Sequence, residues 1–209
     1  MTDILIADDH GIVRRGLKQI LLDEFPEANI REVSNGSDLL REARAGNWTI
    51  IISDLSMPGR NGLETLKQLK EEFPKTPVLI LSMHPEDQYA VRVLRAGASG
   101  YLTKESASDE LVIAVRKILD GRRYISPALA EILAENLEPD SRKALYETLS
   151  DREFDVLKLI ASGKTVSEIA DLLSLSVTTV STYRARILFK TNMKTNAELT
   201  RYAMDNKLV

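Results

Sequence analysis

Acidic, hydroxyl-bearing and basic residues follow the short apolar runs in the first half of the chain. Asp8 and Asp9 follow one run, Asp54 and Ser82 end two others, and Lys104 comes soon after a fourth. If these runs are parallel strands of one sheet, their carboxyl ends meet at one edge, so three carboxylates and an ammonium group converge. Crowded carboxylates repel one another, and a hard divalent cation relieves that repulsion. Magnesium suits such a site because it takes a few carboxylates and keeps several waters.

For Asp8 or Asp9 taken alone, a second interpretation is a helix cap. A short acidic side chain can accept hydrogen bonds from the first turn of the helix expected after Gly11. A cap does not account for Asp54 or for Lys104. The complete set of side chains therefore favours a cation site.

The composition excludes several other chemistries. The 209-residue chain contains no cysteine and two histidines, His10 and His84. A disulfide, a thiolate zinc site, a cysteine nucleophile and a histidine-rich metal site are therefore impossible. Its 44% hydrophobic and 28% charged residues are typical of a soluble globular protein. Because we find neither a membrane-length apolar run nor a signal peptide, we expect a cytoplasmic protein without membrane contact.

Five short apolar runs alternate with amphipathic helical stretches over about the first 120 residues. The runs comprise residues 4–7, 30–33, 50–52, 78–81 and 99–102. Three are apolar throughout, as strands covered on both faces are, whereas the run at 30–33 carries charge and is typical of an edge strand. Such alternation requires right-handed crossovers and predicts the α/β class, with a doubly wound, five-stranded parallel sheet.

The pattern changes after Gly121. A helical stretch from Ser126 to about Leu137 is interrupted at residues 138–141, which predicts a partly helical linker. Helices without strands follow, at about 151–162, 166–173, 177–190 and 196–206. We therefore expect a first domain at residues 1–121, a linker at 122–145 and a small all-α helix-turn-helix domain at 146–209.

Two features mark the C-terminal helices. Capping boxes begin two of them, pairing Ser150 with Glu153 and Thr165 with Glu168. Residues 176–209 hold six basic and two acidic side chains, a net charge of +4 that leaves −7 on the other 175 residues. The overall charge of −3 therefore hides a basic segment, which indicates nucleic-acid binding.

The motif residues of the first domain occur in a definite order. They are Asp8-Asp9, Asp54-Leu55-Ser56-Met57-Pro58 with Gly62, Ser82, and Tyr101-Leu102-Thr103-Lys104. In order and spacing these segments resemble the receiver domain of bacterial response regulators, a flavodoxin-like fold.

The resemblance implies distinct roles for the acidic residues. Asp54 would be the phosphoacceptor, and magnesium would be bound by Asp9, Asp54 and the backbone carbonyl of Ser56. Asp8 would act through a bound water. An aspartyl nucleophile that attacks phosphorus needs cationic groups where charge spreads over the equatorial oxygens, so this division of roles is chemically sound.

The resemblance also implies that Lys104 pairs with phosphoryl oxygens, that Ser82 hydrogen-bonds one of them and that Tyr101 is an aromatic switch. Simple packing is the alternative for Tyr101. His84 lies at a position where, in this family, the side chain influences how fast water removes the phosphoryl group. The alternative for His84 is an exposed loop histidine. Asn61 and Ser82 replace the Asp and Thr common in the family. Ser82 keeps the hydroxyl, and Asn61 is expected to lie outside the pocket chemistry.

The C-terminal domain carries a second set of motif residues. They are Leu149-Ser150-Asp151-Arg152-Glu153, Leu157, Ile160-Ala161-Ser162-Gly163, Glu168-Ile169-Ala170, Leu173, Leu175-Ser176, Thr179-Val180 and Tyr183-Arg184. They resemble the NarL/LuxR-type DNA-binding domain, a four-helix module with a helix-turn-helix. Receiver and module in this order are the layout of NarL-type response regulators.

The helix expected at 177–190 would be the recognition helix. At about 100° per residue, Val180, Arg184 and Ile187 share one face, which we expect to pack on the domain. The candidate DNA contacts on and beside the outward face are Thr178, Ser181, Thr182, Arg184, Ala185, Arg186 and Lys190. Its small polar members suit base edges and its basic members suit phosphates, with a solvated charged face as the alternative.

These features predict a transcription regulator of a two-component system, not an enzyme. A partner histidine kinase would phosphorylate Asp54, and the phosphorylated homodimer would bind half-sites on double-stranded DNA. A phosphohydrolase would need a second acid where Ser56 stands, and an oxidoreductase a glycine-rich loop after the first strand. A constitutive DNA binder, whose receiver is only a dimerisation platform, stays open.

Overall fold

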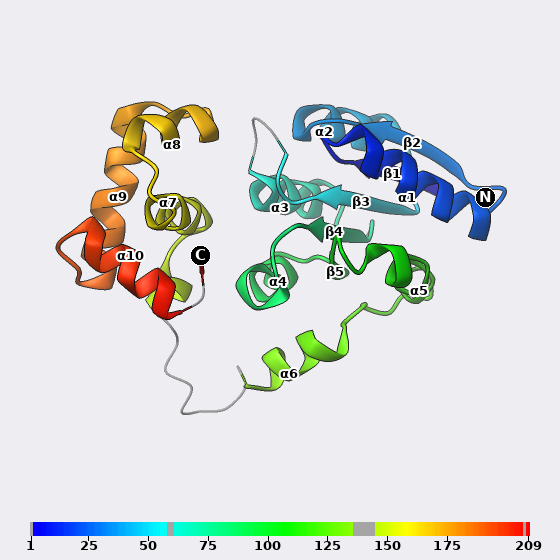
Figure 1. Ribbon diagram of the computed structural model, residues 1–209. Helices are drawn as coiled ribbons and strands as arrows, with labels where there is room; N and C mark the ends of the chain where they lie inside the picture. The colour runs from blue at the N-terminus through cyan, green and yellow to red at the C-terminus, as the bar shows by residue number, and fades with distance from the viewer. Residues whose placement is uncertain (1, 58–60, 136–144, 207) are drawn as a thin grey trace. The chain divides into compact units, whose positions relative to one another are not determined.

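The computed structural model describes residues 2–57, 61–135, 145–206 and 208–209. The chain forms two compact units, Met1–Glu138 and Pro139–Val209, and each is described by itself (Figure 1). None of the described helices combines the length and apolar character that a membrane span requires.

A five-stranded sheet forms the centre of the first unit. Its strands are β1 (Asp3–Ala7), β2 (Asn29–Val33), β3 (Ile50–Asp54), β4 (Val78–Ser82) and β5 (Gly100–Thr103). Their order is β2-β1-β3-β4-β5, and every neighbouring pair is parallel. The predicted α/β class and parallel sheet are confirmed, and the charged strand β2 lies at an edge as expected.

Helices cover both faces of this sheet. They are α1 (Gly11–Glu24), α2 (Gly36–Ala45), α3 (Gly62–Glu72), α4 (Glu86–Arg95) and α5 (Ala107–Leu119). Ile4 and Ile6 of β1 belong to one core cluster with Leu21 of α1 and Leu111 of α5. Leu5 points to the opposite face and is also fully buried. Burial on both faces explains why the strand sequence is apolar at consecutive positions.

The segment after α5 continues into a further helix, α6 (Pro127–Glu135), which packs against α4. Leu129 of α6 is fully buried. The Ser126 hydroxyl contacts both carboxylate oxygens of Glu86, at 2.8 and 2.6 Å, and accepts a bond from the Leu129 amide. The interruption expected at residues 138–141 lies outside the described residues. The domain limits at 121 and 146 stay predictions.

The described residues of the second unit form helices and the turns that join them, without strands. It contains a short 3-10 helix, η1 (Leu145–Thr148), and then α7 (Asp151–Ala161), α8 (Val166–Leu173), α9 (Val177–Thr191) and α10 (Asn196–Asp205). The bounds of the four α-helices agree with the expected ranges to within one residue. Both predicted capping boxes are present, at the starts of α7 and α8. Contacts of α7 with α9 and α10, and of α8 with α9, enclose the core.

Candidate functional site

The carboxyl ends of the central strands bring two acids and one base together. Asp54 ends β3, and Asp8 follows the neighbouring strand β1. The Nζ atom of Lys104 lies 2.7 Å from Asp8 Oδ2 and 2.8 Å from Asp54 Oδ2. Asp8 and Asp54 are 0% and 1% exposed, so a single ammonium group bridges two carboxylates that water does not reach.

Burial and charge act in opposite directions on these groups. Burial raises the pKa of Asp54 above its ordinary value, although bonds from Lys104 and the Ser56 amide oppose that shift. Burial would lower the pKa of Lys104, but its bonds to Asp54 and Asp8 hold that pKa above its ordinary value. Lys104 is therefore charged at neutral pH and partly neutralises the two acids.

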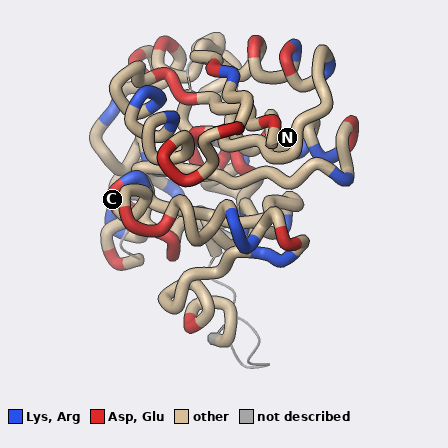
Figure 2. The backbone as a smooth tube through the Cα atoms, turned by 90° about the vertical axis from the view of Figure 1, so that its right-hand side faces the viewer, with Lys and Arg blue, Asp and Glu red and all other residues tan. Residues whose placement is uncertain are grey.

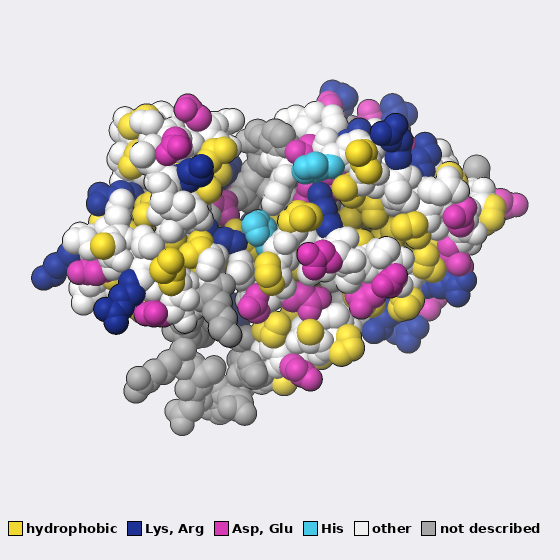
Figure 3. All heavy atoms as spheres, in the orientation of Figure 1, with side chains coloured by type: hydrophobic (Ala, Val, Ile, Leu, Met, Phe, Trp, Pro, Cys, Tyr) yellow, Lys and Arg dark blue, Asp and Glu magenta, His cyan; other side chains and the backbone are white. Residues whose placement is uncertain are grey.

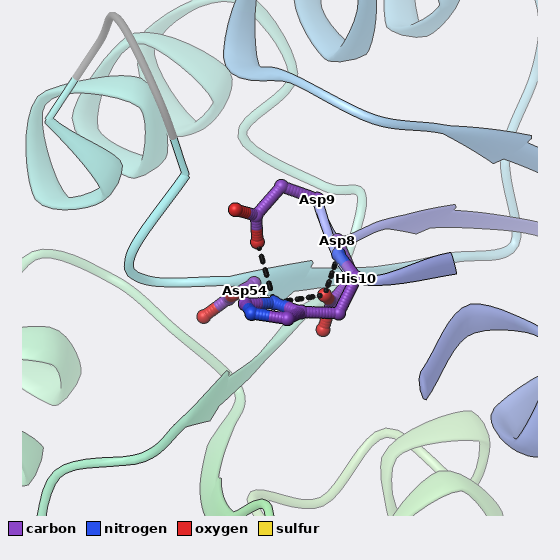
Figure 4. A group of neighbouring side chains, drawn as sticks. All are labelled: Asp8, Asp9, His10 and Asp54. Atoms are coloured by element: carbon purple, nitrogen blue, oxygen red, sulfur yellow. Dashed lines mark hydrogen bonds and ion pairs between the residues drawn. The ribbon is translucent and has the colours of Figure 1, made fainter. Parts of the chain in front are cut away.

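A third carboxylate and an imidazole complete the cluster. Asp8, Asp9, His10 and Asp54 each present a ligand atom within 4.8 Å of the others (Figure 4). His10 Nδ1 lies 2.8 Å from Asp9 Oδ1 and 3.3 Å from Asp8 Oδ1. Three carboxylates against one ammonium group leave an excess of negative charge, and their oxygens are the donors that hard divalent cations prefer. The donor set therefore fits a magnesium-like ion.

His10 was not predicted as a member of this cluster. The available signal was its position directly after Asp9, but adjacency alone does not determine where a ring points. The alternative in which Asp8 or Asp9 caps α1 is wrong, because His10 itself is the N-cap residue. The Asp8 carboxylate instead accepts the His10 amide at 2.7 Å, which positions the imidazole over the acids.

The segment after β3 is shaped by two residues at the start of α3. Asn61 caps this helix, accepting bonds from the amides of Leu63 and Glu64 at 2.8 and 3.2 Å. A Cβ atom on Gly62 would lie 2.0 Å from the carbonyl oxygen of Leu55, so only glycine allows this close approach. Closer to β3, the Ser56 amide donates to Asp54 Oδ1 at 3.0 Å. Asn61 is therefore the N-cap of α3.

Ser82, His84 and Tyr101 form a second, linked group. Ser82 is fully buried at the end of β4, and its Oγ accepts the His84 amide at 3.0 Å. The hydroxyl of the fully buried Tyr101 donates to the His84 carbonyl at 2.6 Å, and burial raises the pKa of Tyr101. The half-buried His84 ring stacks on Tyr89 of α4, with ring centroids 4.7 Å apart, so His84 is not simply an exposed loop residue.

In the second unit, α9 has the packed face that its periodicity predicts. Val180 and Ile187 are fully buried. The exposed candidate contacts are Thr178, Ser181, Thr182, Ala185, Arg186 and Lys190. The short connection from α8 to α9 includes Ser174 in the left-handed region, with φ of 54°, and the Ser176 hydroxyl caps α9. α9 therefore presents a polar face beside a tight helix-turn-helix connection.

Two basic candidates have partners within this unit. Arg184 donates to Asn196 Oδ1 at 2.6 Å. Lys190 lies 2.6 Å from Oε2 of Glu153, whose side chain is 3% exposed. Basic and acidic positions are interspersed along the chain (Figure 2), so the charge available to a ligand depends on such partners. Arg186 is exposed and is the basic member of the outward face best placed for an external anion.

Both regions match known protein families. Residues 4–116 match the response regulator receiver domain, and residues 147–203 match the bacterial regulatory proteins of the luxR family. The chain is 34% identical to response regulator UvrY of Escherichia coli strain K12, over 100% of this chain and 96% of that protein. It is 35% identical to response regulator GacA of Pseudomonas aeruginosa, over 100% of this chain and 98% of that protein.

The fold also matches solved structures of full-length regulators. RcsB from Salmonella enterica serovar Typhimurium, bound to promoter rprA in the presence of phosphomimetic BeF3-, has a TM-score of 0.68 and 28% identity. That match covers 97% of this chain and 98% of RcsB. Matches of this extent make the chain a transcription regulator rather than an enzyme, which excludes the phosphohydrolase and oxidoreductase alternatives. The chain belongs to the NarL/LuxR family of two-component response regulators, with a receiver domain followed by a LuxR-type DNA-binding domain.

Proposed function

We propose that Asp54 accepts a phosphoryl group from a partner histidine kinase and that this modification controls dimerisation and sequence-specific DNA binding. The observation that carries the proposal is the bridge made by Lys104 between Asp54 and Asp8, at 2.8 and 2.7 Å, beside a third carboxylate. A buried carboxylate nucleophile with a fixed ammonium group beside it suits phosphoryl transfer, where charge accumulates on the transferred oxygens.

Each pocket residue has a role in this proposal. A carboxylate oxygen of Asp54 forms a bond to the phosphorus of the kinase phosphohistidine, and the P–N bond breaks so that the kinase imidazole leaves. Lys104 then pairs with the phosphoryl oxygens, which carry the negative charge. The Ser82 hydroxyl donates to one of those oxygens. Asp9, Asp54 and the backbone carbonyl of Ser56 would hold a magnesium ion, with Asp8 acting through water, and the ion would supply the remaining positive charge.

The linked group of Ser82, His84 and Tyr101 connects the site of phosphorylation to α4 and β5. The Ser82 hydroxyl can donate its proton to a phosphoryl oxygen while its oxygen still accepts the His84 amide, at 3.0 Å, so a movement of Ser82 toward the phosphoryl group would also move His84. His84 also accepts the Tyr101 hydroxyl and stacks on Tyr89 of α4. We propose that Tyr101 acts as a switch through these contacts and passes the change toward α4 and β5.

The polar face of α9 is the proposed DNA-reading surface. Thr178, Ser181, Thr182 and Ala185 are small enough to approach base edges in a major groove, and Arg186 suits a phosphate. Residues 149–209 hold nine basic and seven acidic side chains, so one copy neutralises few phosphates. A homodimer on paired half-sites binds more tightly by effective concentration. Promoter-bound RcsB supports this interpretation, and a genomic DNA target implies action in the cytoplasm.

The decisive experiment measures phosphoryl uptake. The full chain is incubated with magnesium and a small phosphodonor, and the intact mass is followed with time for wild type, Asp54→Asn and the exposed-surface control Asp120→Asn. Wild type and Asp120→Asn are expected to gain one phosphoryl mass, and Asp54→Asn none. Uptake by Asp54→Asn at the wild-type rate would overturn the assignment of the phosphoacceptor.

A further inference from the structure

Thr182 lies on the exposed polar face of α9, and its hydroxyl group already has a partner within the helix. Thr178, Thr182 and Ala185 are four and three residues apart, so their side chains form one stripe along the helix, and all three are exposed. Oγ1 of Thr182 donates to the backbone carbonyl of Thr178 at 2.9 Å. Because a hydroxyl group has one proton, Thr182 does not have a donor left for a base.

The group that Thr182 offers to an external ligand is therefore its γ-methyl. Ala185, on the next turn of α9, adds a second methyl and no polar side-chain atom. We call these two residues the methyl pair. On the face of the second unit that Figure 3 shows, basic, apolar and uncharged polar side chains are interspersed, so what this surface recognises depends on individual residues. The methyl pair is an apolar spot beside the exposed polar side chains of Ser181 and Arg186.

The major groove of DNA offers one apolar group to such a surface, the C5 methyl of thymine. The other base edges present nitrogen and oxygen acceptors or amino donors. A methyl group that covers one of those acceptors or donors removes its water without replacing the hydrogen bond, which is unfavourable. Contact between methyl groups instead removes apolar surface from water, which is favourable. The methyl pair is therefore chemically matched to thymine.

We propose that the methyl pair selects a thymine in each DNA half-site by contact with its C5 methyl, and that Thr182 does so without a hydrogen bond to a base. The proposal rests on the DNA-reading role of α9 in the proposed function, and it names the base feature that this face recognises. Loss of the thymine methyl should weaken binding about fourfold at each contact, the change in affinity expected for one buried methyl-sized group.

The competing interpretation is that the Thr182 hydroxyl leaves the Thr178 carbonyl and hydrogen-bonds a base. In that case Thr182→Val, which removes the hydroxyl but keeps the branched shape, would lose the sequence preference, and the thymine methyl would not matter. Methyl contact has the opposite signature. Thr182→Val keeps a methyl group for the contact, whereas Thr182→Ser keeps the hydroxyl and loses the methyl.

The test uses the full chain and deoxyuridine, which pairs as thymidine does and lacks only its methyl group. Sites are first selected from randomised duplex DNA, and each thymine of the selected half-site is then replaced in turn. We expect one position at which deoxyuridine weakens binding by wild type and Thr182→Val about fourfold, and by Thr182→Ser less than about 1.5-fold. The matched control is Thr148→Ser, which should behave as wild type. Thr148 is exposed outside α9, and its hydroxyl also donates to a backbone carbonyl, that of Leu145.

Three results would overturn the proposal. Wild type could tolerate deoxyuridine at every position, Thr182→Ser could show the same loss of affinity as wild type, or Thr182→Val could lose the sensitivity to deoxyuridine. In each case the chain still binds its selected DNA, so the DNA-binding function stands and only the methyl contact fails. If the full chain selects no sequence at all, the DNA-reading role of α9 fails, and the methyl contact fails with it.

Discussion

At the scale of single residues, Lys104 partly neutralises the negative charge of the buried carboxylates in the pocket. Its ammonium group, in a side chain that is 7% exposed, bonds two carboxylates that are almost completely buried. Breaking a buried ion pair from one side costs about 3–5 kcal/mol, because the remaining charge has neither water nor a partner. We expect Lys104→Met to lower the free energy of unfolding by about 3 kcal/mol at neutral pH without divalent cations.

Urea unfolding followed by the fluorescence of Trp48, the only tryptophan, measures this change in the receiver unit. Lys75→Met, at an exposed loop lysine, is the control and should leave the midpoint almost unchanged. Magnesium should recover part of the loss in Lys104→Met, since a cation can replace the missing charge. Equal stability of Lys104→Met and Lys75→Met would show that the bridge does not stabilise the fold.

Glu153 makes the stability of the second unit depend on pH in the acid range. Burial would raise its pKa, but Lys190 and the Ser150 cap hold the pKa of Glu153 below its ordinary value. A carboxyl group whose pKa is depressed by folding contributes stability above its ordinary pKa, and that contribution is lost as pH falls through the folded-state value. Glu153→Gln should therefore remove part of the acid sensitivity of α7 and α9.

Hydrogen exchange of the α7 and α9 amides, measured across the acid range, checks this prediction. At neutral pH, Glu153→Gln should lower their protection by about 1–2 kcal/mol, since a buried acceptor loses a charge-assisted bond. Asp205→Asn changes an ion-pair residue with a side chain 68% exposed and should have little effect. An unaltered acid profile in Glu153→Gln would show that the acid sensitivity of α7 and α9 comes from another group.

At the scale of whole elements, the Ser126 hydroxyl links the start of α6 to the start of α4. Ser126 contacts Glu86 at 2.8 and 2.6 Å and also accepts the Leu129 amide at 3.0 Å. Ser126→Ala removes these bonds together, and the loss of a helix cap alone costs about 1 kcal/mol. We expect faster hydrogen exchange across α6, corresponding to about 1–2 kcal/mol, with unchanged protection in β1 and β3.

Ser108→Ala is the matched control, because Ser108 lies on the exposed surface of α5. Equal protection of α6 in Ser126→Ala and wild type would show that the apolar contact of Leu129 alone holds this helix. The contrast matters for signalling because α4 also carries Tyr89, which stacks on His84 beside the pocket. Helix α4, which would receive the proposed signal from His84, therefore also contacts α6, the helix that follows α5.

At the scale of the whole molecule, phosphorylation must change DNA binding by a finite coupling free energy. Couplings between sites are typically about 1–3 kcal/mol, which corresponds to roughly 5- to 150-fold in affinity. We expect the beryllofluoride complex of the full chain to dimerise and to bind promoter DNA more tightly than the unmodified chain. Asp54→Asn should not respond to beryllofluoride.

Sedimentation and DNA titration compare these forms with the fragment 139–209, the second compact unit. A fragment that binds more tightly than the unmodified chain would indicate that the receiver restrains α9, whereas a weaker fragment would indicate that dimerisation supplies the affinity. Identical mass behaviour and affinity in all forms would favour the constitutive DNA binder.

The sequence by itself determined the elements and the edge at which the acids gather. Consecutive apolar residues such as Ile50 to Ile52 required strands covered on both faces, and parallel strands place Asp8, Asp54 and Lys104 at one edge whatever the packing details. Capping residues, including Ser150 and Thr165, likewise determined helix starts, because a cap depends on neighbours only three residues away.

Only the tertiary structure decided which groups the side chains of Lys190 and His10 contact. Helical periodicity places Lys190 on a face of α9, but Glu153, 37 positions away, is brought to it by the packing of α7. Adjacency places His10 near Asp9, but the turn of the backbone into α1 directs its ring over the acids. Local patterns report the preferences of a residue and its near neighbours, whereas contacts distant in sequence depend on how the elements pack.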